Sequence, residues 1–251
     1  MKIWGIADLH LSFGVKNKSM EVFGPQWKEH AEQIKTSWER LIHPDDLVLI
    51  PGDISWAMRL EDALPDLKWI DRLPGIKVLL KGNHDFWWGS LAKIAPVLPP
   101  SIHLIQNNCF LWKGAAIGGT RLWDTPEYDF GTFVEMRENP RARPVEMEEA
   151  VQEDLSDKIF ERELQRLEMS LSKMPADASP RIAMTHYPPI GADLKPSRAS
   201  QLLERHHIDL CVFGHLHNLR GGLSLFGKKN GVHYVLAAAD YIHFQPFLLF
   251  S

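Results

Sequence analysis

The sequence predicts the α/β fold class, in which helices cover the faces of a β-sheet. In the first third of the chain, short aliphatic runs alternate with longer amphipathic runs, which is the β-α-β-α-β rhythm of such folds. A chain of 251 residues with 45% hydrophobic and 24% charged residues is typical of a soluble globular protein with a sizeable core. No linker, internal repeat or low-complexity tract divides the sequence, so we expect one domain over residues 1–251.

Three short apolar runs in this first third predict buried strands, because each is bounded by polar residues or by proline and glycine. These strands are expected at residues 2–7, 47–50 and 76–80. Between them, the apolar residues of 27–42 recur at helical spacing along one face. Residues 60–73 have a similar pattern, which we expect Pro65 to interrupt, and a short helix is expected near 90–95.

The middle of the chain predicts three more short strands and then an insertion. The strands are expected at residues 102–105, 109–112 and 115–117, with turns between them. Gly118-Gly119-Thr120 should open a less regular segment, and residues 121–144 should form a long surface loop. Residues 145–173 predict an amphipathic helix with Leu155 near its apolar face, so we expect a loop-plus-helix insertion at about 121–175.

The last third of the chain continues the α/β pattern and then changes to hairpins. Apolar runs at 181–184 and 208–213 predict strands, and Pro196 and Ser197 precede a predicted helix that ends at about Arg205. Residues 227–231 separate two apolar runs and contain two glycines, which is typical of an antiparallel hairpin.

Side chains that can bind metal ions or phosphate follow five of the predicted strands. They are Asp8 with His10, Asp53, Asn83 with His84, His186, and His215 with His217. Asp8 and His10 are two positions apart, so they point the same way if the chain stays extended. Any one of these endings also fits an ordinary loop. Because ligands bind at the ends of strands in α/β sheets, five such endings together predict a functional site.

The mixture of carboxylate, amide and imidazole groups indicates the chemistry of that site. Neutral imidazole and carboxylate ligands together suit borderline divalent metals better than calcium or copper(I). The number of candidate ligands also exceeds what one ion needs. Two ions sharing a carboxylate would use them all, and ions roughly 3.5–4 Å apart are a known arrangement for phosphoryl displacement.

The same residues resemble the signature of the calcineurin-like metallophosphoesterase superfamily. The matching motifs are Asp8-x-His10, Gly52-Asp53, Gly82-Asn83-His84-Asp85, His186 and Gly214-His215-x-His217. The resemblance implies a four-layer α/β/β/α sandwich with two mixed sheets. It also implies a metal-dependent phosphohydrolase with two divalent cations, whose identity as manganese, iron or zinc stays open.

The resemblance implies a role for each matching residue. One ion would be held by Asp8, His10, Asp53 and His217, and the other by Asp53, Asn83, His186 and His215, so Asp53 would bridge them. A hydroxide between the ions would attack phosphorus. His84 would contact the phosphate and protonate the leaving oxygen, and Asp85 would orient His84.

Differences between this sequence and two branches of the family narrow the branch to which it is expected to belong. Trp56-Ala57-Met58 stands where the protein phosphatases carry Asp-Arg-Gly, and Asp85 stands where they carry Glu. The lipid-A precursor hydrolases have Arg at the position of His84. The pattern is similar to small prokaryotic phosphodiesterases, so we favour a small-molecule or nucleotide phosphodiester as the substrate. A nuclease is the main alternative, and a phosphomonoesterase or a non-catalytic scaffold is a weaker one.

Charge and hydropathy bear on the partners. The formal net charge is −4 and no Lys/Arg run exceeds Lys228-Lys229, so we do not expect a nucleic acid partner. The expected partner is a small-molecule phosphoester substrate. No apolar run is long enough to cross a bilayer. Cys109 and Cys211 both lie in predicted strands, where buried free thiols are expected. With no signal-peptide pattern at the start, we expect a reducing, cytoplasmic location.

Two groups of residues near the motifs carry open interpretations. Trp56, Trp87, Trp88 and Trp123 lie beside motif loops, where they could form an aromatic wall for a flat group or pack the loops into the core. The other seven histidines are expected to have ordinary packing or surface roles. They are His30, His43, His103, His206, His207, His233 and His243. Of these, His103, His233 and His243 lie in strand-like runs.

Overall fold

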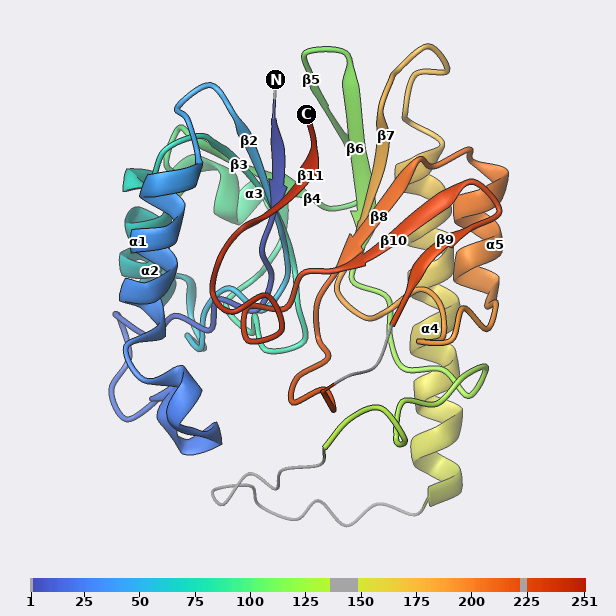
Figure 1. Cartoon of the computed structure of the whole chain (residues 1–251), viewed down its shortest axis with the longest axis horizontal. Coiled ribbons are helices and arrows are strands. Elements are labelled where there is room, and N and C mark those ends of the chain that lie inside the picture. The colour runs from blue at the N-terminus through green and yellow to red at the C-terminus, as the bar shows by residue number, and fades with distance from the viewer. Residues whose placement is uncertain (1, 136–148, 222–224) are drawn as a thin grey trace.

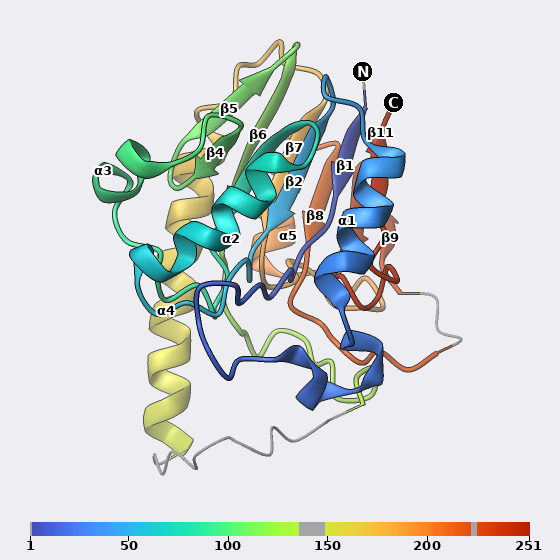
Figure 2. The ribbon, with the colours of Figure 1, turned by 90° about the vertical axis from the view of Figure 1, so that its left-hand side faces the viewer.

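The computed structural model describes residues 2–135, 149–221 and 225–251. Two β-sheets pack face to face, and each carries helices on its outer face (Figure 1). Helices α1 and α2 cover the first sheet, as Figure 2 shows, and α4 and α5 cover the second. The expected four-layer α/β/β/α sandwich with two mixed sheets is therefore confirmed.

The elements follow one another along the chain much as the sequence predicts. The strands are β1 (Ile3–Gly5), β2 (Leu47–Pro51), β3 (Ile76–Leu80), β4 (Ile102–Ile105), β5 (Cys109–Trp112), β6 (Ala115–Thr120), β7 (Arg181–Thr185), β8 (Leu210–Phe213), β9 (Gly227–Lys229), β10 (Val232–Leu236) and β11 (Phe247–Phe250). The α-helices are α1 (His30–Leu41), α2 (Leu60–Arg72), α3 (Leu91–Ile94), α4 (Glu149–Leu171) and α5 (Arg198–Arg205). The short 3₁₀ helices are η1 (Met20–Phe23), η2 (Pro25–Trp27) and η3 (Ala95–Val97).

Both sheets have a parallel centre, with one antiparallel edge in the first sheet and two in the second. The first has the order β11-β1-β2-β3-β4, in which only β11 is antiparallel to its neighbour. The second has the order β5-β6-β7-β8-β10-β9, with the antiparallel pairs β5–β6 and β10–β9 at its two edges. The expected hairpin in the tail is the β9–β10 pair. The parallel strands of each sheet deliver their carboxyl ends to one edge, which is where the site lies.

The period-2 alternation of each strand explains the layering. In β2, Leu47 and Leu49 face the second sheet, whereas Val48 and Ile50 face the helices. In β7, Met184 faces the first sheet and Ala183 faces α4 and α5. Because central strands bury both faces, they read as continuous apolar runs, which is why the sequence marks them so clearly.

Strand β6 is longer than predicted, since Gly118-Gly119-Thr120 continues it and does not begin an irregular segment. A Cβ atom on Gly118 would lie 2.8 Å from Cε of Met174 and 2.9 Å from Oγ of Ser170. At Gly119, where φ is +154°, a Cβ atom would collide with the carbonyl oxygen of Met184 on β7. The glycines therefore allow close packing within the second sheet and against α4, although they weaken the strand signal in the sequence.

Two predictions about helices were also wrong in detail. Helix α2 runs through Pro65 without interruption, because a proline in its early turns removes one hydrogen bond and the packed apolar face holds the rest. The helix predicted over 27–42 begins at His30. Trp27 closes the 3₁₀ helix before it, and Glu29 between them has φ of 52°, which breaks the helical path.

The predicted insertion contributes a loop and helix α4. Its residues 136–148, including the first residues of the predicted helix, lie outside the described part of the chain, and its status as an insertion stays a prediction. Leu155, expected near the apolar face, is 49% exposed, because α4 runs past the edge of the second sheet (Figure 1). Residues 133–135 pair with 218–220 through the Val134–Leu219 bridge.

Cys211 is a buried free thiol as expected, but Cys109 on the edge strand β5 is only half-buried. Of the helices in the described ranges, none combines the length and the apolar character needed to cross a membrane.

Replacing Gly119 with alanine should destabilise the fold by about 3 kcal/mol or more, because the new methyl group collides with β7 and the backbone is strained. Thermal and urea unfolding will measure this loss. Gly221→Ala is the control, since a Cβ atom there meets nothing within 4 Å. Equal stability of the two variants would show that the β6–β7 contact is not tight.

Candidate metal centre

All the side chains predicted for the site converge at one edge of the sandwich. They follow the carboxyl ends of β1, β2, β3, β7 and β8, at the lower edge of the sheets in Figure 1. The first three strands belong to one sheet and the last two to the other. The site therefore lies where the two sheets meet, and each sheet supplies part of it.

The loop after β1 reaches the site by a different path from the one predicted. Asp8 and His10 do converge, but the chain between them is not extended, because their φ angles are 59° and 45°. Asp8 N–H donates to Gly52 O over 3.0 Å, and His10 N–H donates to Asp53 O over 2.9 Å. These bonds to the loop after β2 hold the left-handed backbone, a strained conformation that is common at functional sites.

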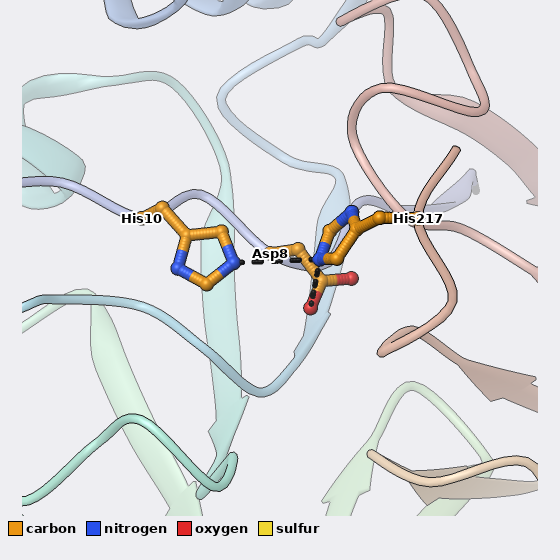
Figure 3. A group of neighbouring side chains, drawn as sticks. All are labelled: Asp8, His10 and His217. Carbon is orange, nitrogen blue, oxygen red and sulfur yellow. Dashed lines mark hydrogen bonds and ion pairs between the residues drawn. The ribbon is translucent and has the colours of Figure 1, made fainter. Parts of the chain in front are cut away.

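The first group of candidate ligands brings Asp8 and His10, near the start of the chain, together with His217. The Nε2 atoms of His10 and His217 lie 3.5 Å apart, and Nε2 of His217 lies 3.7 Å from Oδ1 of Asp8 (Figure 3). Nε2 of His10 also lies 3.8 Å from Oδ2 of Asp53. These nitrogen and oxygen atoms surround a common point, as the ligands of one ion would.

The second group shares Asp53 with the first. Oδ1 of Asn83 lies 2.6 Å from Nε2 of His186 and 3.1 Å from Nδ1 of His215. Nε2 of His186 lies 3.5 Å from Oδ2 of Asp53. The carboxylate of Asp53 therefore faces both groups, as the predicted bridging role requires.

Partners outside the two groups fix which nitrogen atoms face inward. Nδ1 of His186 lies 3.0 Å from Pro51 O, and Nδ1 of His217 lies 2.8 Å from Oδ1 of Asp240. When Nδ1 carries the proton and donates it to these acceptors, each Nε2 presents a lone pair to the site. His10 is held differently, because its ring stacks on Trp56 at 5.0 Å between centroids.

Asp240 was not predicted from the sequence. It follows β10 and the run Ala237-Ala238-Ala239, so it is one more carboxylate after a strand, and this signal was available. Its Oδ2 also accepts a hydrogen bond from Asn218 N–H at 3.1 Å. Asp240 thus fixes both the ring of His217 and the loop that carries it.

Burial sets the protonation states of the imidazoles. It lowers the pKa of His10 and His215 well below the usual value and that of His186 to about 3. Burial alone would also lower the pKa of His217, but its bond to Asp240 and the charge of Asp8 raise it to about 9. Three of the four imidazoles are therefore held neutral, which is the state that binds metal.

The donor atoms fit a cation. A neutral His186 that donates through Nδ1 leaves Nε2 as an acceptor, and this atom faces another acceptor, Oδ1 of Asn83, at 2.6 Å. Burial also raises the pKa of Asp8 and Asp53, which lie together in this closed region. Lone pairs and carboxylates that converge in this way would be stabilised by divalent cations bound between them.

Close approach of the backbone at Gly82 brings the loops together. A Cβ atom at Gly82 would collide with Oδ1 and the backbone nitrogen of Asp53. The next loop residues then bind the same carboxylate, because His84 N–H donates to Oδ1 of Asp53 over 2.8 Å. Glycine before Asn83 is therefore a packing requirement of the site, as well as a turn signal.

His84 lies at the mouth of the site. Its side chain is 38% exposed, and its Nε2 lies 4.0 Å from Oδ2 of Asp53. The ring lies 4.6 Å from that of Trp56. His84 is therefore outside the two ligand groups but adjacent to them, which is where a group that contacts substrate would lie.

The expected role of Asp85 in orienting His84 is not what the structure shows. Asp85 is fully buried, and Oδ1 accepts hydrogen bonds from Ile54 N–H, Ser55 N–H and the indole of Trp87. Oδ2 accepts from Gly82 N–H at 2.8 Å. Asp85 thus ties the loop after β3 to the loop after β2, and it positions Asn83 and Asp53 instead of the His84 ring.

The four tryptophans beside the motif loops were expected either to form an aromatic wall for a flat group or to pack the loops into the core. Trp87 and Trp88 are buried, so packing explains them. Trp56 lines the cavity over the ligands, and Trp123 lines a neighbouring cavity and packs at 5.1 Å on Tyr187.

Ordinary contacts explain the remaining histidines that the structure pairs. His30 lies 3.0 Å from Leu9 O, and His206 lies 2.8 Å from Glu168. His103 and His233 lie in strands, but His243 lies in a turn with φ of 53°.

Comparison with known proteins agrees with this geometry. The sequence profile of the calcineurin-like phosphoesterases matches residues 1–219. The chain belongs to this family. Members of this family are metal-dependent phosphoesterases that typically depend on two metal ions.

Two phage proteins resemble part of this chain in sequence, and one solved structure resembles it in fold. The gene 66 proteins of Mycobacterium phages L5 and D29 are 33% and 31% identical over 84 and 83 residues, in each case 33% of this chain. The matches span 39% and 40% of the phage proteins, so the chain covers well under half of their length. Phosphopantetheinyl hydrolase (PptH) from Mycobacterium tuberculosis has a similar fold, with a TM-score of 0.53 and 16% identity over 94% of this chain and 88% of that one.

Gly82→Ala should displace Asp53 and so reduce both the bound metal and the activity, the latter by about 100-fold. Metal content after reconstitution with manganese, measured by mass spectrometry, is the direct test. Gly89→Ala is the matched control seven residues away, where a Cβ atom meets nothing within 4 Å. Full metal content in Gly82→Ala would remove the close approach as a constraint on the site.

Proposed function

We propose that this phosphoesterase hydrolyses a small-molecule or nucleotide phosphodiester. The observation that supports the proposal is the position of the candidate ligands between two cavities. His215, Leu216 and Val134 line both of them, so the cavities meet beside the metal ligands. A phosphodiester carries an organic group on each side of its phosphorus, and the site offers room on two sides.

The first cavity is largely apolar and encloses about 400 Å³. Met20, Phe23 and Trp27 form one side, and Trp56 lies beside His10 and His84. Aromatic walls of this kind suit a base or another flat group.

The second cavity encloses about 510 Å³ on the other side of His215. The loop that follows β6 supplies Trp123 and Tyr128, and Tyr187 packs on His215 with ring centroids 4.0 Å apart. A monoester would occupy one of the two cavities and leave the other empty.

The charges near the site oppose the nuclease alternative. Among the described residues that line either cavity there is no lysine or arginine, whereas Glu135, Asp124 and Asp129 are acidic. Lys18 is nearby, with Nζ 5.5 Å from the Trp56 ring. A nucleic acid backbone needs a track of positive charge, so these walls favour a small substrate.

Some residues of the chain would hold the metal ions, and another would transfer a proton. Two divalent cations held by the ligand groups described above would supply Lewis acidity and neutralise phosphate charge. Asp240 and Pro51 O would keep His217 and His186 in their binding tautomers. His84, outside the ligand groups and partly exposed to the cavity, would contact the phosphate and donate a proton to the leaving oxygen.

The function is tested with bis(p-nitrophenyl) phosphate and p-nitrophenyl phosphate in the presence of manganese. We expect kcat/KM to be about tenfold or more higher on the diester, because the monoester fills only one cavity. Asp53→Asn, which weakens both metal groups, is the control for contaminating phosphatases. A preference for the monoester would favour a phosphomonoesterase, and cleavage of nucleic acid alone would favour a nuclease.

His84→Ala should lose more kcat on an alkyl ester than on a nitrophenyl ester. Nitrophenolate is weakly basic and departs without a proton, whereas an alkoxide needs one, so the difference should approach the roughly 10²–10⁴-fold of acid catalysis. The variant should keep most of its metal. Equal losses on both esters would assign His84 to phosphate binding alone.

Trp56→Ala should raise KM for a thymidine nitrophenyl phosphodiester by about fivefold or more, because base stacking contributes roughly 1–3 kcal/mol. KM for methyl nitrophenyl phosphate should change much less. Trp56→Phe keeps an aromatic face against His10 and serves as the control, with metal content measured in all three proteins. Parallel changes on both substrates would mean that Trp56 only packs the site.

A further inference from the structure

A third cavity lies apart from the metal centre and is lined by basic side chains. It encloses about 320 Å³ where the carboxyl ends of β3, β4 and β6 meet helix α4. We call it the basic cavity and define it by Lys81, Arg121, Arg162, Arg166 and Glu163. None of the described residues that line it also lines either substrate cavity.

The basic cavity holds far more positive than negative charge. Four of its lining side chains are cationic, and Glu163 is the one carboxylate among the described residues of the lining. Glu163 is only 1% exposed. The formal charge of the lining is therefore +4 − 1 = +3.

This single carboxylate is already saturated. Its Oε1 lies 2.7 Å from Nη1 of Arg166, 3.5 Å from Nη2 of Arg162 and 3.8 Å from Nη2 of Arg121. Its Oε2 accepts a hydrogen bond from the hydroxyl of Thr120 at 2.7 Å. Three guanidinium groups thus share one oxygen atom, and one negative charge cannot balance them.

Simple anchoring of α4 does not explain this cluster. Arg162 and Arg166 are four residues apart on the helix, where like charges repel each other. Arg121 is only 17% exposed, so water screens its charge poorly. One arginine would suffice to pair Glu163. Arg121 also lies over the Trp123 ring at 4.5 Å, but this contact removes none of the positive charge that Arg162, Arg166 and Lys81 add, and that charge favours a bound anion.

We propose that the basic cavity binds a small multivalent oxyanion of the phosphate class. Guanidinium groups match the planar spacing of phosphate oxygens, and Lys81, whose Nζ donates to Trp88 O over 3.2 Å, adds a point charge to the same lining. The position also suits a ligand, since it lies beyond the carboxyl ends of parallel strands.

The basic cavity adjoins the metal centre through the backbone. Arg121 O accepts hydrogen bonds from His186 N–H at 3.1 Å and Tyr187 N–H at 2.9 Å. Lys81 directly precedes Gly82 and Asn83. An anion held here would therefore contact two segments that carry metal ligands, without occupying the substrate cavities.

The test uses inorganic phosphate and the full chain, in metal-loaded and metal-free forms. Metal is removed by chelation and the chelator, itself an anion, is dialysed away before calorimetric titration. The basic cavity should bind phosphate in both forms, because none of its cations belongs to the candidate ligands. Binding at the metal centre should disappear with the metal, so the two sites are distinguished whatever the outcome for the proposed reaction.

The double variant Arg162→Gln/Arg166→Gln should weaken the metal-independent binding by about tenfold or more, whereas Arg162→Lys/Arg166→Lys should keep part of it. The control Arg40→Gln/Arg205→Gln removes the same charge away from the cavity and should bind as the unaltered protein does. The side chains of Arg162 and Arg166 are about half exposed, at 51% and 43%, so the fold should tolerate their replacement.

A second measurement needs no variant. Phosphate should raise the unfolding temperature of the metal-free protein more than chloride does at the same ionic strength, by mass action on the folded state. The proposal is overturned if the metal-free protein binds no phosphate, or if the double variant and its control bind it equally.

Discussion

The carboxylate of Asp53 is the contact on which the rest of the site depends. It is almost fully buried, and its two oxygen atoms have separate tasks. Oδ1 accepts the His84 N–H and lies against Gly82, which fixes the loop after β3 to the loop after β2. Oδ2 faces nitrogen atoms of His10 and His186, one from each ligand group. A buried carboxylate is costly without compensating charge, so the fold places an electrostatic penalty where two cations would remove it.

The sequence was a good guide to the fold and to the ligands for one physical reason. Central parallel strands bury both faces, so they appear as uninterrupted apolar runs, and the polar residues that end them are conspicuous. This signal locates Asp53, Asn83 and His186 directly. It fails where glycine replaces side-chain bulk, as at the end of β6, because close packing there depends on the absence of atoms. It also fails at Pro65, where tertiary packing overrides a local preference.

The contacts of a side chain could not be predicted in the same way. By resemblance, Asp85 was expected to orient His84, but its carboxylate instead accepts four hydrogen bonds. Two come from the backbone of Ile54 and Ser55, which are remote in sequence, and the others come from Gly82 N–H and the Trp87 indole. Asp240 holds His217 from a position 23 residues away, and the three alanines before it read only as strand. The two cavities beside the candidate ligands likewise need the loop at 133–135 to meet the loop at 218–220, which no local pattern predicts.

The bridge between Ala7, after β1, and Ala238, after β10, determines when a metal can bind during folding. Asp8 is placed by Ala7, whose N–H donates to Ala237 O and whose carbonyl accepts from Ala239 N–H. The candidate ligands His10 and His217 thus come together only after segments more than 200 residues apart have joined. Closing such a long loop is slow and entropically costly, so the ions cannot nucleate this fold as zinc nucleates a small finger domain. They can only select the finished structure, and cellular metal supply would then control the lifetime of the folded chain more than the speed with which it forms.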